Sequence, residues 1–317
     1  MIDQLISLHP LLFHSIIFLA SLIVLAKSSD MVVYGISNYA KKLGISDYLI
    51  GFIVISIGTA LPELLAALNG ALVNQGELAF GVVMGSNLFK IPLLGILLVI
   101  AVSVKNKIDF TGSSPMTTFI ITIAPLLLVI DGLLSRIDGI VLLILFFLYI
   151  VKLWQSEGTL GKIKEKVAFK SIYKEAIISV IALTALLLSA RWLVFSSIQL
   201  SKMLNIPSYI VGLLVIGIGA SAPELMVQLR SIRSKHQNMA IGNVLGSLIA
   251  NSAFVFGIVA LIKPISIGFS TLVVTLIFMS IGTIILLKTM MHKELSWKDG
   301  LLFILVYALF LLAEFVF

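Results

Sequence analysis

Apolar positions run along this chain in long blocks separated by short polar breaks. Each block holds about 20 residues, enough for a helix to cross a hydrocarbon core of about 30 Å. The blocks lack the strict alternation of apolar and polar positions that is typical of barrel strands. Because lipid offers the backbone no hydrogen-bond partners, blocks this long predict helices.

The blocks predict ten transmembrane helices and leave no separate soluble domain. The composition agrees, since 60% of the residues are hydrophobic and only 12% are charged, far from the values of soluble domains. The fold class is therefore an all-α integral membrane protein. The expected spans are 11–39, 45–70, 78–101, 115–131, 137–155, 172–196, 206–230, 238–262, 267–288 and 297–316.

The charges predict how the chain is oriented. With ten spans, sixteen Lys and Arg residues fall on one side of the membrane and three on the other. By the positive-inside rule, both termini of this multi-pass cell-membrane protein are extracellular and the Lys-rich linker 156–171 is cytoplasmic. The net charge of +7 is thus attributed to topology and anionic lipid headgroups, and not to nucleic-acid binding.

Two further features of composition narrow the possibilities. The first ten residues, "MIDQLISLHP", lack the basic start and cleavage site of a signal peptide, so the first helix is expected to be retained. Cysteine is absent, which excludes disulfides, thiolate metal sites and cysteine catalysis.

The chain resembles itself when it is shifted by 161 residues. "LGISDYLIGFIVISIGTALPE" (43–63) and "LNIPSYIVGLLVIGIGASAPE" (204–224) share ten of twenty-one positions without a gap. The same offset superimposes Gly81 on Gly242, Gly85 on Gly246 and Ser86 on Ser247. These matches indicate a duplication, and the four glycines are interpreted as close-packing positions.

The duplication predicts two inverted repeats. Each copy carries five spans, residues 1–155 and 172–317 around the 156–171 linker, and an odd number makes the second copy enter the membrane from the opposite side. Inverted repeats are common in secondary transporters, which bind their substrate near the midplane on broken helices. A duplicated scaffold without transport is the alternative.

Two glutamates at equivalent positions are the first candidates for a site. Glu63 and Glu224 lie deep in the second and seventh spans, each directly after a proline. Carboxylates within a membrane are expensive and are functional hypotheses by default. The prolines also remove one helical hydrogen bond each, so the carbonyls of Gly58 and Gly219 are expected to need a partner, such as a cation.

Hydroxyl and amide oxygens accompany the carboxylates. Thr59 and Ser221 share a helix face with Glu63 and Glu224 respectively. Carboxylate, hydroxyl and backbone oxygens suit Na⁺ and Ca²⁺. In the third and eighth spans, the pairs Ser86/Lys90 and Ser247/Asn251 are repeat equivalents, and for Asn251 a ligand role is weighed against simple helix packing.

These motifs resemble those of the cation/calcium exchanger superfamily, in particular the prokaryotic sodium/calcium exchangers. That family carries G-T-S-L-P-E followed by G-N-x-x-G-S-N in each half. Here the first copy has "GTALPE" and "GVVMGSN", and the second has "GASAPE" and "GNVLGSL". The resemblance covers nearly the whole chain in helix number and spacing.

The resemblance implies a site and a motion. Glu63 and Glu224 would be the central metal ligands shared by Ca²⁺ and Na⁺. Hydroxyls for flanking sites would come from Thr59, Ser86, Ser221 and Ser247. The first and sixth helices would slide across the rest to alternate access.

The departures from the family pattern concern charge and hydroxyls. Ala60 and Ala220 each replace a motif hydroxyl residue, and Lys90 stands where relatives carry Asn or Asp. An ammonium near the glutamates repels Ca²⁺ strongly at low dielectric. Burial disfavours a charged lysine and neighbouring carboxylates favour it. Lys90 is therefore either the exchanged charge of a proton-coupled antiporter, a permanent tethered cation, or a side chain that snorkels toward water.

The function predicted is a cation antiporter that moves Ca²⁺ against H⁺ or Na⁺. The alternative is a repurposed exchanger fold, with Lys90 as a tethered cation, that carries or binds something else. No enzyme motif is present, so no catalytic residues are assigned. The expected partners are small inorganic cations and the bilayer, with no cofactor, no nucleic acid and no obligatory protein partner.

Overall fold

A computed structural model describes residues 10–42, 56–103, 115–157, 169–221, 237–291 and 297–316. These ranges are almost wholly helical, as the apolar blocks predict. Up to residue 157 the helices are α2 (Pro10–Lys42), α4 (Ser56–Thr59), α5 (Leu61–Leu72), α6 (Gly76–Ser103), α7 (Pro115–Leu128) and α8 (Arg136–Glu157). From residue 169 they are α9 (Phe169–Leu204), α10 (Ser208–Ile210), the π-helical η2 (Val211–Ile216), α12 (Gln237–Ile249), the π-helical η3 (Ala250–Val255), α13 (Phe256–Ile262), α14 (Phe269–Met291) and α15 (Trp297–Val316).

The helices bear out a multi-pass membrane protein. Within the described ranges, five stretches are long and apolar enough to cross a bilayer: Pro10–Ser28, Gly76–Ile100, Val180–Leu204, Asn243–Ile262 and Leu272–Met291. The expected spans 45–70 and 206–230 lie partly outside the described residues. So does most of the 156–171 linker, although α8 and α9 extend into its two ends.

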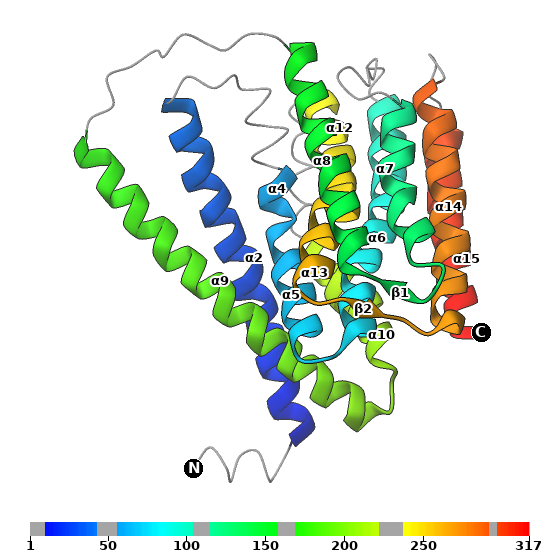
Figure 1. Cartoon of the computed structure of the whole chain (residues 1–317), viewed down its shortest axis with the longest axis horizontal. Coiled ribbons are helices and arrows are strands. Elements are labelled where there is room, and N and C mark those ends of the chain that lie inside the picture. Colours follow the sequence, from blue (N-terminus) through cyan, green and yellow to red (C-terminus); the bar gives the residue numbers. More distant parts are fainter. Residues whose placement is uncertain are drawn as a thin grey trace.

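One small element departs from an all-α fold. Strand β1 (Leu133–Leu134) pairs antiparallel with β2 (Ile265–Ser266). The pair ties the connection after α7 to the connection after α13. Figure 1 shows it on the lower side of the molecule, where α2 also begins and α15 ends.

Helix α6 forms the centre of the molecule and is largely buried. It touches α10 and η2 backbone to backbone, because a Cβ on Gly85 would lie 1.9 Å from the Leu213 carbonyl oxygen. A Cβ on Gly217 would likewise lie 2.7 Å from the amide nitrogen of Ser86. Gly81 makes a similar approach to Tyr209. The packing roles predicted for Gly81 and Gly85 therefore agree with the structure, and these contacts bring Ser86 against the second half of the chain.

Helices α2 and α9 form a separate pair that is inclined to the other helices in Figure 1. The buried face of α2 repeats at spacings of four and three, the pattern of a coiled-coil seam. Serines recur on both sides of this seam, and those of α9 bond within their own chain segment, as Ser197 does to the carbonyl of Leu193. The buried residues of the α2 seam are His14, Phe18, Ser21, Leu25 and Ser28.

Candidate functional site

The site starts from a broken helix. Helix α4 ends at Thr59 and α5 begins at Leu61, with Pro62 in the first turn of α5, where its missing N–H is not needed. Glu63 follows in the same turn and is fully buried. The break thus places the Glu63 carboxylate in the first turn of α5, within the buried interior of the molecule.

The Ser86 hydroxyl is the centre of a buried cluster that joins the two halves of the chain. Its Oγ donates to Glu63 Oε1 at 2.8 Å and lies 2.7 Å from Ser221 Oγ. Lys90 Nζ donates to the same Oγ at 3.1 Å, and Asn251 Nδ2 donates to it at 3.0 Å. Ser221 also reaches Glu63 Oε1, at 3.1 Å.

Four polar groups thus surround one hydroxyl oxygen. A hydroxyl has one hydrogen to donate and two lone pairs with which to accept, so it can satisfy three partners at a time. When the Ser86 hydroxyl donates its hydrogen bond to the Glu63 carboxylate, its oxygen accepts hydrogen bonds from Lys90 and Asn251. The Ser221 hydroxyl then donates either to Glu63 or to the Gly217 carbonyl, which lies 3.0 Å away. The cluster thus offers the Ser86 hydroxyl more hydrogen-bond partners than it can satisfy at one time.

Lys90 lies inside this cluster and does not snorkel. Its side chain is 1% exposed, and its ammonium points back one helical turn to Ser86. Among the described residues, the ammonium meets Glu63 through the Ser86 hydroxyl. The snorkelling alternative is therefore wrong, and Lys90 contributes its charge where the sequence places the cation ligands.

Two buried acceptor oxygens in the cluster lack a partner within the described part of the chain. Glu63 Oε2 and Asn251 Oδ1 accept no hydrogen bond from any described residue. Both residues are fully buried, and an unpaired acceptor in such a place is costly unless a water or a cation binds it. Within the described part of the chain no group of three His, Cys, Asp or Glu gathers. The oxygens available here for a hard cation come from one carboxylate, hydroxyls and amides.

The remaining sequence candidates lie in varied positions. Ser247 is buried, but its hydroxyl donates to the carbonyl of Val244 in its own helix, at 3.1 Å. Gly58 and Thr59 end α4 directly before the break, and each has an interaction partner. Gly219 approaches the Leu22 side chain of α2. Glu224 falls outside the described residues.

One buried pair was not singled out from the sequence. Asn87 Nδ2 donates to Ser252 Oγ at 3.0 Å, and both side chains are fully buried. Asn87 is the last residue of "GVVMGSN", so the motif itself contained the signal. Ser252 lies in η3, whose wide π turn could not be read from composition.

A comparison with known proteins gives this cluster its context. The family model described as sodium/calcium exchanger protein matches residues 13–155 and again residues 174–316. The chain belongs to the sodium/calcium exchanger family. Proteins of this family are membrane transporters that exchange cations, and the two matches begin 161 residues apart, the offset found within the sequence.

Individual relatives agree with the family. The chain is 32% identical to the inner membrane protein YrbG of Escherichia coli over 80% of its own length and 81% of that protein. It is 25% identical to the sodium/calcium exchanger MaX1 of Methanosarcina acetivorans over 95% and 98% of the two chains. A putative antiporter, CaxA of Alkalimonas amylolytica, is 29% identical over 80% and 82%.

Solved structures agree as well. The sodium-calcium exchanger NCX_Mj soaked with 2.5 mM Na⁺ and 10 mM Sr²⁺ matches with a TM-score of 0.65 and 26% sequence identity. The match covers 94% of this chain and 98% of NCX_Mj. The exchanger fold is thus shared over nearly the whole length of both proteins.

Proposed function

We propose that the protein is a secondary cation antiporter that moves Ca²⁺ against Na⁺ or H⁺ by alternating access. The main support for this proposal is the Glu63 carboxylate, which lies at the break between two helices. It accepts hydrogen bonds from the hydroxyl of Ser86 and from that of Ser221, which belongs to the other half of the chain. A cation held there contacts both halves of the chain at once. Sliding of the first and sixth helices, α2 and α9, across the rest of the molecule then exposes the cation to one side or the other.

We further propose ten transmembrane helices in two inverted repeats, 1–155 and 172–317, joined by the 156–171 linker. Two reciprocal contacts support this. Gly95 of α6 meets the Gly300 carbonyl of α15, and Gly139 of α8 meets the Gly257 carbonyl of α13. Under the 161-residue offset Gly139 corresponds to Gly300, and Gly95 corresponds to the neighbour of Gly257. Each half therefore clamps the other through the same elements.

The orientation and the full ligand set are part of the same proposal. Both termini are extracellular, since α2 begins and α15 ends on one side of the molecule (Figure 1) and the Lys-rich linker belongs on the cytoplasmic side. The central metal ligands are Glu63 and Glu224. Flanking oxygens come from Thr59, Ser86, Ser221, Ser247, Asn251 and the carbonyls of Gly58 and Gly219.

A second function is favoured by one observation, the position of Lys90. Its ammonium bonds to the hydroxyl that also binds Glu63, so it occupies the electrostatic place of a transported cation. A permanently held ammonium there makes the protein a carrier of monovalent ions, or a binding protein, that does not exchange Ca²⁺.

The test is uptake of radioactive Ca²⁺ into proteoliposomes, driven separately by a Na⁺ gradient and by a pH gradient. Lys90→Asn removes one positive charge from the cluster and gives the first copy the residue of the second. We expect the native chain to take up Ca²⁺ and the variant to require at least about tenfold less Ca²⁺ for half-maximal uptake.

Lys152→Asn is the matched control, because Lys152 also bonds a hydroxyl, that of Thr117, but lies exposed at the end of α8. It should leave the Ca²⁺ requirement unchanged. Uptake by the Lys90→Asn variant alone would establish the tethered-cation function. Absence of uptake in both proteins under both gradients would refute Ca²⁺ antiport.

A further inference from the structure

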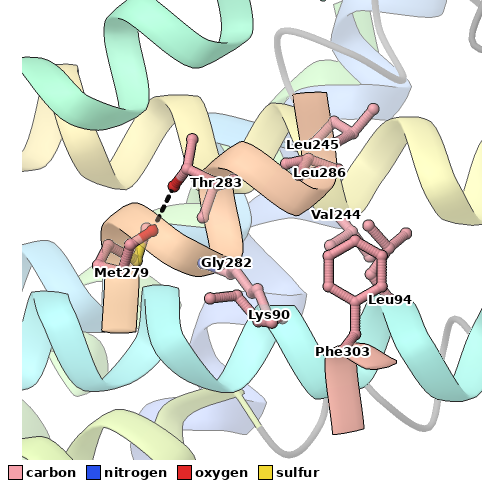
Figure 2. A pocket seen from close by; sticks show the side chains of 11 residues that line it. Lys90, Leu94, Val244, Leu245, Met279, Gly282, Thr283, Leu286 and Phe303 are labelled. Carbon is pink, nitrogen blue, oxygen red and sulfur yellow. Dashed lines mark hydrogen bonds between the residues drawn. The ribbon is translucent and has the colours of Figure 1, made fainter. Parts of the chain in front are cut away.

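A small pocket lies beside Lys90, between α6, α12, α14 and α15. Its lining includes Lys90 itself, Met279, Gly282, Thr283, Leu286 and Phe303. Figure 2 shows Lys90 next to Gly282 of α14, with Thr283 and Met279 on the same helix. Lys90 therefore contacts two environments: its tip bonds to Ser86 in the cluster, and its side chain forms part of the wall of this pocket.

The pocket is apolar except for one hydroxyl. Thr283 Oγ1 donates its hydrogen to the Met279 carbonyl at 2.7 Å (Figure 2), which leaves its lone pairs available to accept. Gly282 lets the Ile91 side chain of α6 approach α14, since a Cβ at Gly282 would lie 2.3 Å from the tip of Ile91, which also lines the pocket. Both features come from α14, a helix that carries none of the proposed cation ligands.

A cation at Glu63 needs the Lys90 tip to leave. The two positive charges would otherwise share the single oxygen of the buried Ser86 hydroxyl, and their repulsion is large at low dielectric. The side chain has four rotatable bonds, and its neighbours Leu88 and Leu93 on α6 are close-packed and buried. The pocket is the empty space that the side chain already borders.

We propose that this pocket is the second seat of the Lys90 side chain, meaning an alternative position for its amine, with the Thr283 hydroxyl as the hydrogen-bond acceptor. The tip lies on Ser86 when no cation is bound and moves to Thr283 when one enters. The single hydroxyl in the apolar pocket binds the Lys90 amine less strongly than the Ser86 cluster does. Cation binding must supply this difference in free energy, so the affinity of the protein for the cation is lowered. Thr283 and Gly282 are then specificity-determining residues that never touch the ion.

This inference rests on the proposed function, and a double-mutant cycle separates the two. Thr283→Val keeps the volume of the side chain and removes the acceptor. It is measured in the native chain and in Lys90→Asn, as the Ca²⁺ concentration for half-maximal uptake into proteoliposomes. We expect Thr283→Val to increase this Ca²⁺ concentration about fivefold in the native background and less than about twofold in the Lys90→Asn background.

Thr289→Val is the matched control. Thr289 is also buried on α14 and also donates to the carbonyl four residues back, that of Ile285, but it does not line the pocket. It should have no effect in either background. Gly282→Ala narrows the pocket by a second route and should repeat the Thr283→Val result in both backgrounds.

The outcomes are distinct. An equal effect of Thr283→Val in both backgrounds, or none in the native chain, would overturn the second seat while leaving Ca²⁺ antiport intact. Uptake confined to the Lys90→Asn variant would mean that the lysine does not leave, and would also overturn it. If neither background takes up Ca²⁺, the proposed function fails, and the second seat fails with it.

Discussion

Helix α6 and the segment α12–η3–α13 are repeat equivalents under the 161-residue offset, yet they reach the cluster in different ways. α6 is one uninterrupted α-helix, and it presents a long side chain, Lys90, that bends back to Ser86 on its own helix. The second segment is interrupted by the π turn η3, which carries Asn251 and Ser252 across to α6. One copy extends its side chain and the other deforms its backbone.

The two copies differ in the contacts of their described residues. Ser86 of the first copy bonds groups from both halves, and its equivalent Ser247 donates to a carbonyl of its own helix, while Glu224 lies outside the described residues. The positive charge also belongs to one copy alone, because Asn251 stands at the position equivalent to Lys90. A cation bound at Glu63, as proposed, would therefore meet a lysine from one half and an amide from the other.

The close contact that brings the halves together is the most sensitive part of this arrangement. In Gly85→Ala, the new Cβ would lie 1.9 Å from the backbone oxygen of Leu213, which cannot move without shifting η2. We expect a loss of ~3 kcal/mol or more of folding free energy and little monodisperse protein by gel filtration in detergent. In Gly70→Ala the nearest atom is a Leu78 methyl at 3.2 Å, so that variant should be recovered like the native protein. Normal yield of Gly85→Ala would contradict the backbone contact.

The charge at the centre comes next. Glu63→Gln keeps the shape of the side chain but removes the negative charge that we propose binds the cation, a change worth ~3 kcal/mol or more, or about 100-fold in affinity. Ca²⁺ uptake at a fixed low concentration should fall to background. Glu77→Gln makes the same chemical change in the first turn of α6, outside the cluster, and should retain uptake. Retained uptake by Glu63→Gln would remove Glu63 from the ligand set.

The two equivalent serines give the finest comparison. Ser86→Ala removes a hydroxyl oxygen that we propose as a cation ligand, and we expect about a tenfold increase in the Ca²⁺ concentration for half-maximal uptake. Ser247→Ala removes a hydroxyl that bonds its own helix and should change that concentration by less than about threefold. Equal effects of the two substitutions would show that the site is symmetric after all.

Much of the fold could be predicted from the sequence, because a run of about 20 apolar residues has few alternatives in a membrane. Repeat arithmetic and motif spacing also selected Glu63, Ser86, Lys90, Ser221 and Asn251, all of which meet in the cluster. What the sequence could not provide was how they meet. Ser221 was expected to share a helix face with Glu224, which lies outside the described residues, and its bond to Glu63 across the halves was not foreseen.

The features that escaped prediction depend on packing between distant segments. A π turn such as η3 holds one extra residue in the helical turn and forms where packing against neighbouring helices stabilises it, so a local sequence pattern does not predict it. The Thr283 pocket likewise is lined by side chains from four helices, α6, α12, α14 and α15. Sequence periodicity describes one helix at a time, so contacts of this kind remain outside its reach.

The inclined pair α2 and α9 has a consequence for the surrounding lipid. With 33 and 36 residues, these helices are each about 50 Å long, well beyond a hydrocarbon core of about 30 Å. Their apolar stretches, Pro10–Ser28 and Val180–Leu204, cover only part of each helix, and any movement of the pair along its seam changes how much of this apolar surface each leaflet must cover. The rate of cation exchange should therefore depend on the acyl-chain length of the lipids, because deforming the bilayer contributes to the free energy of the movement.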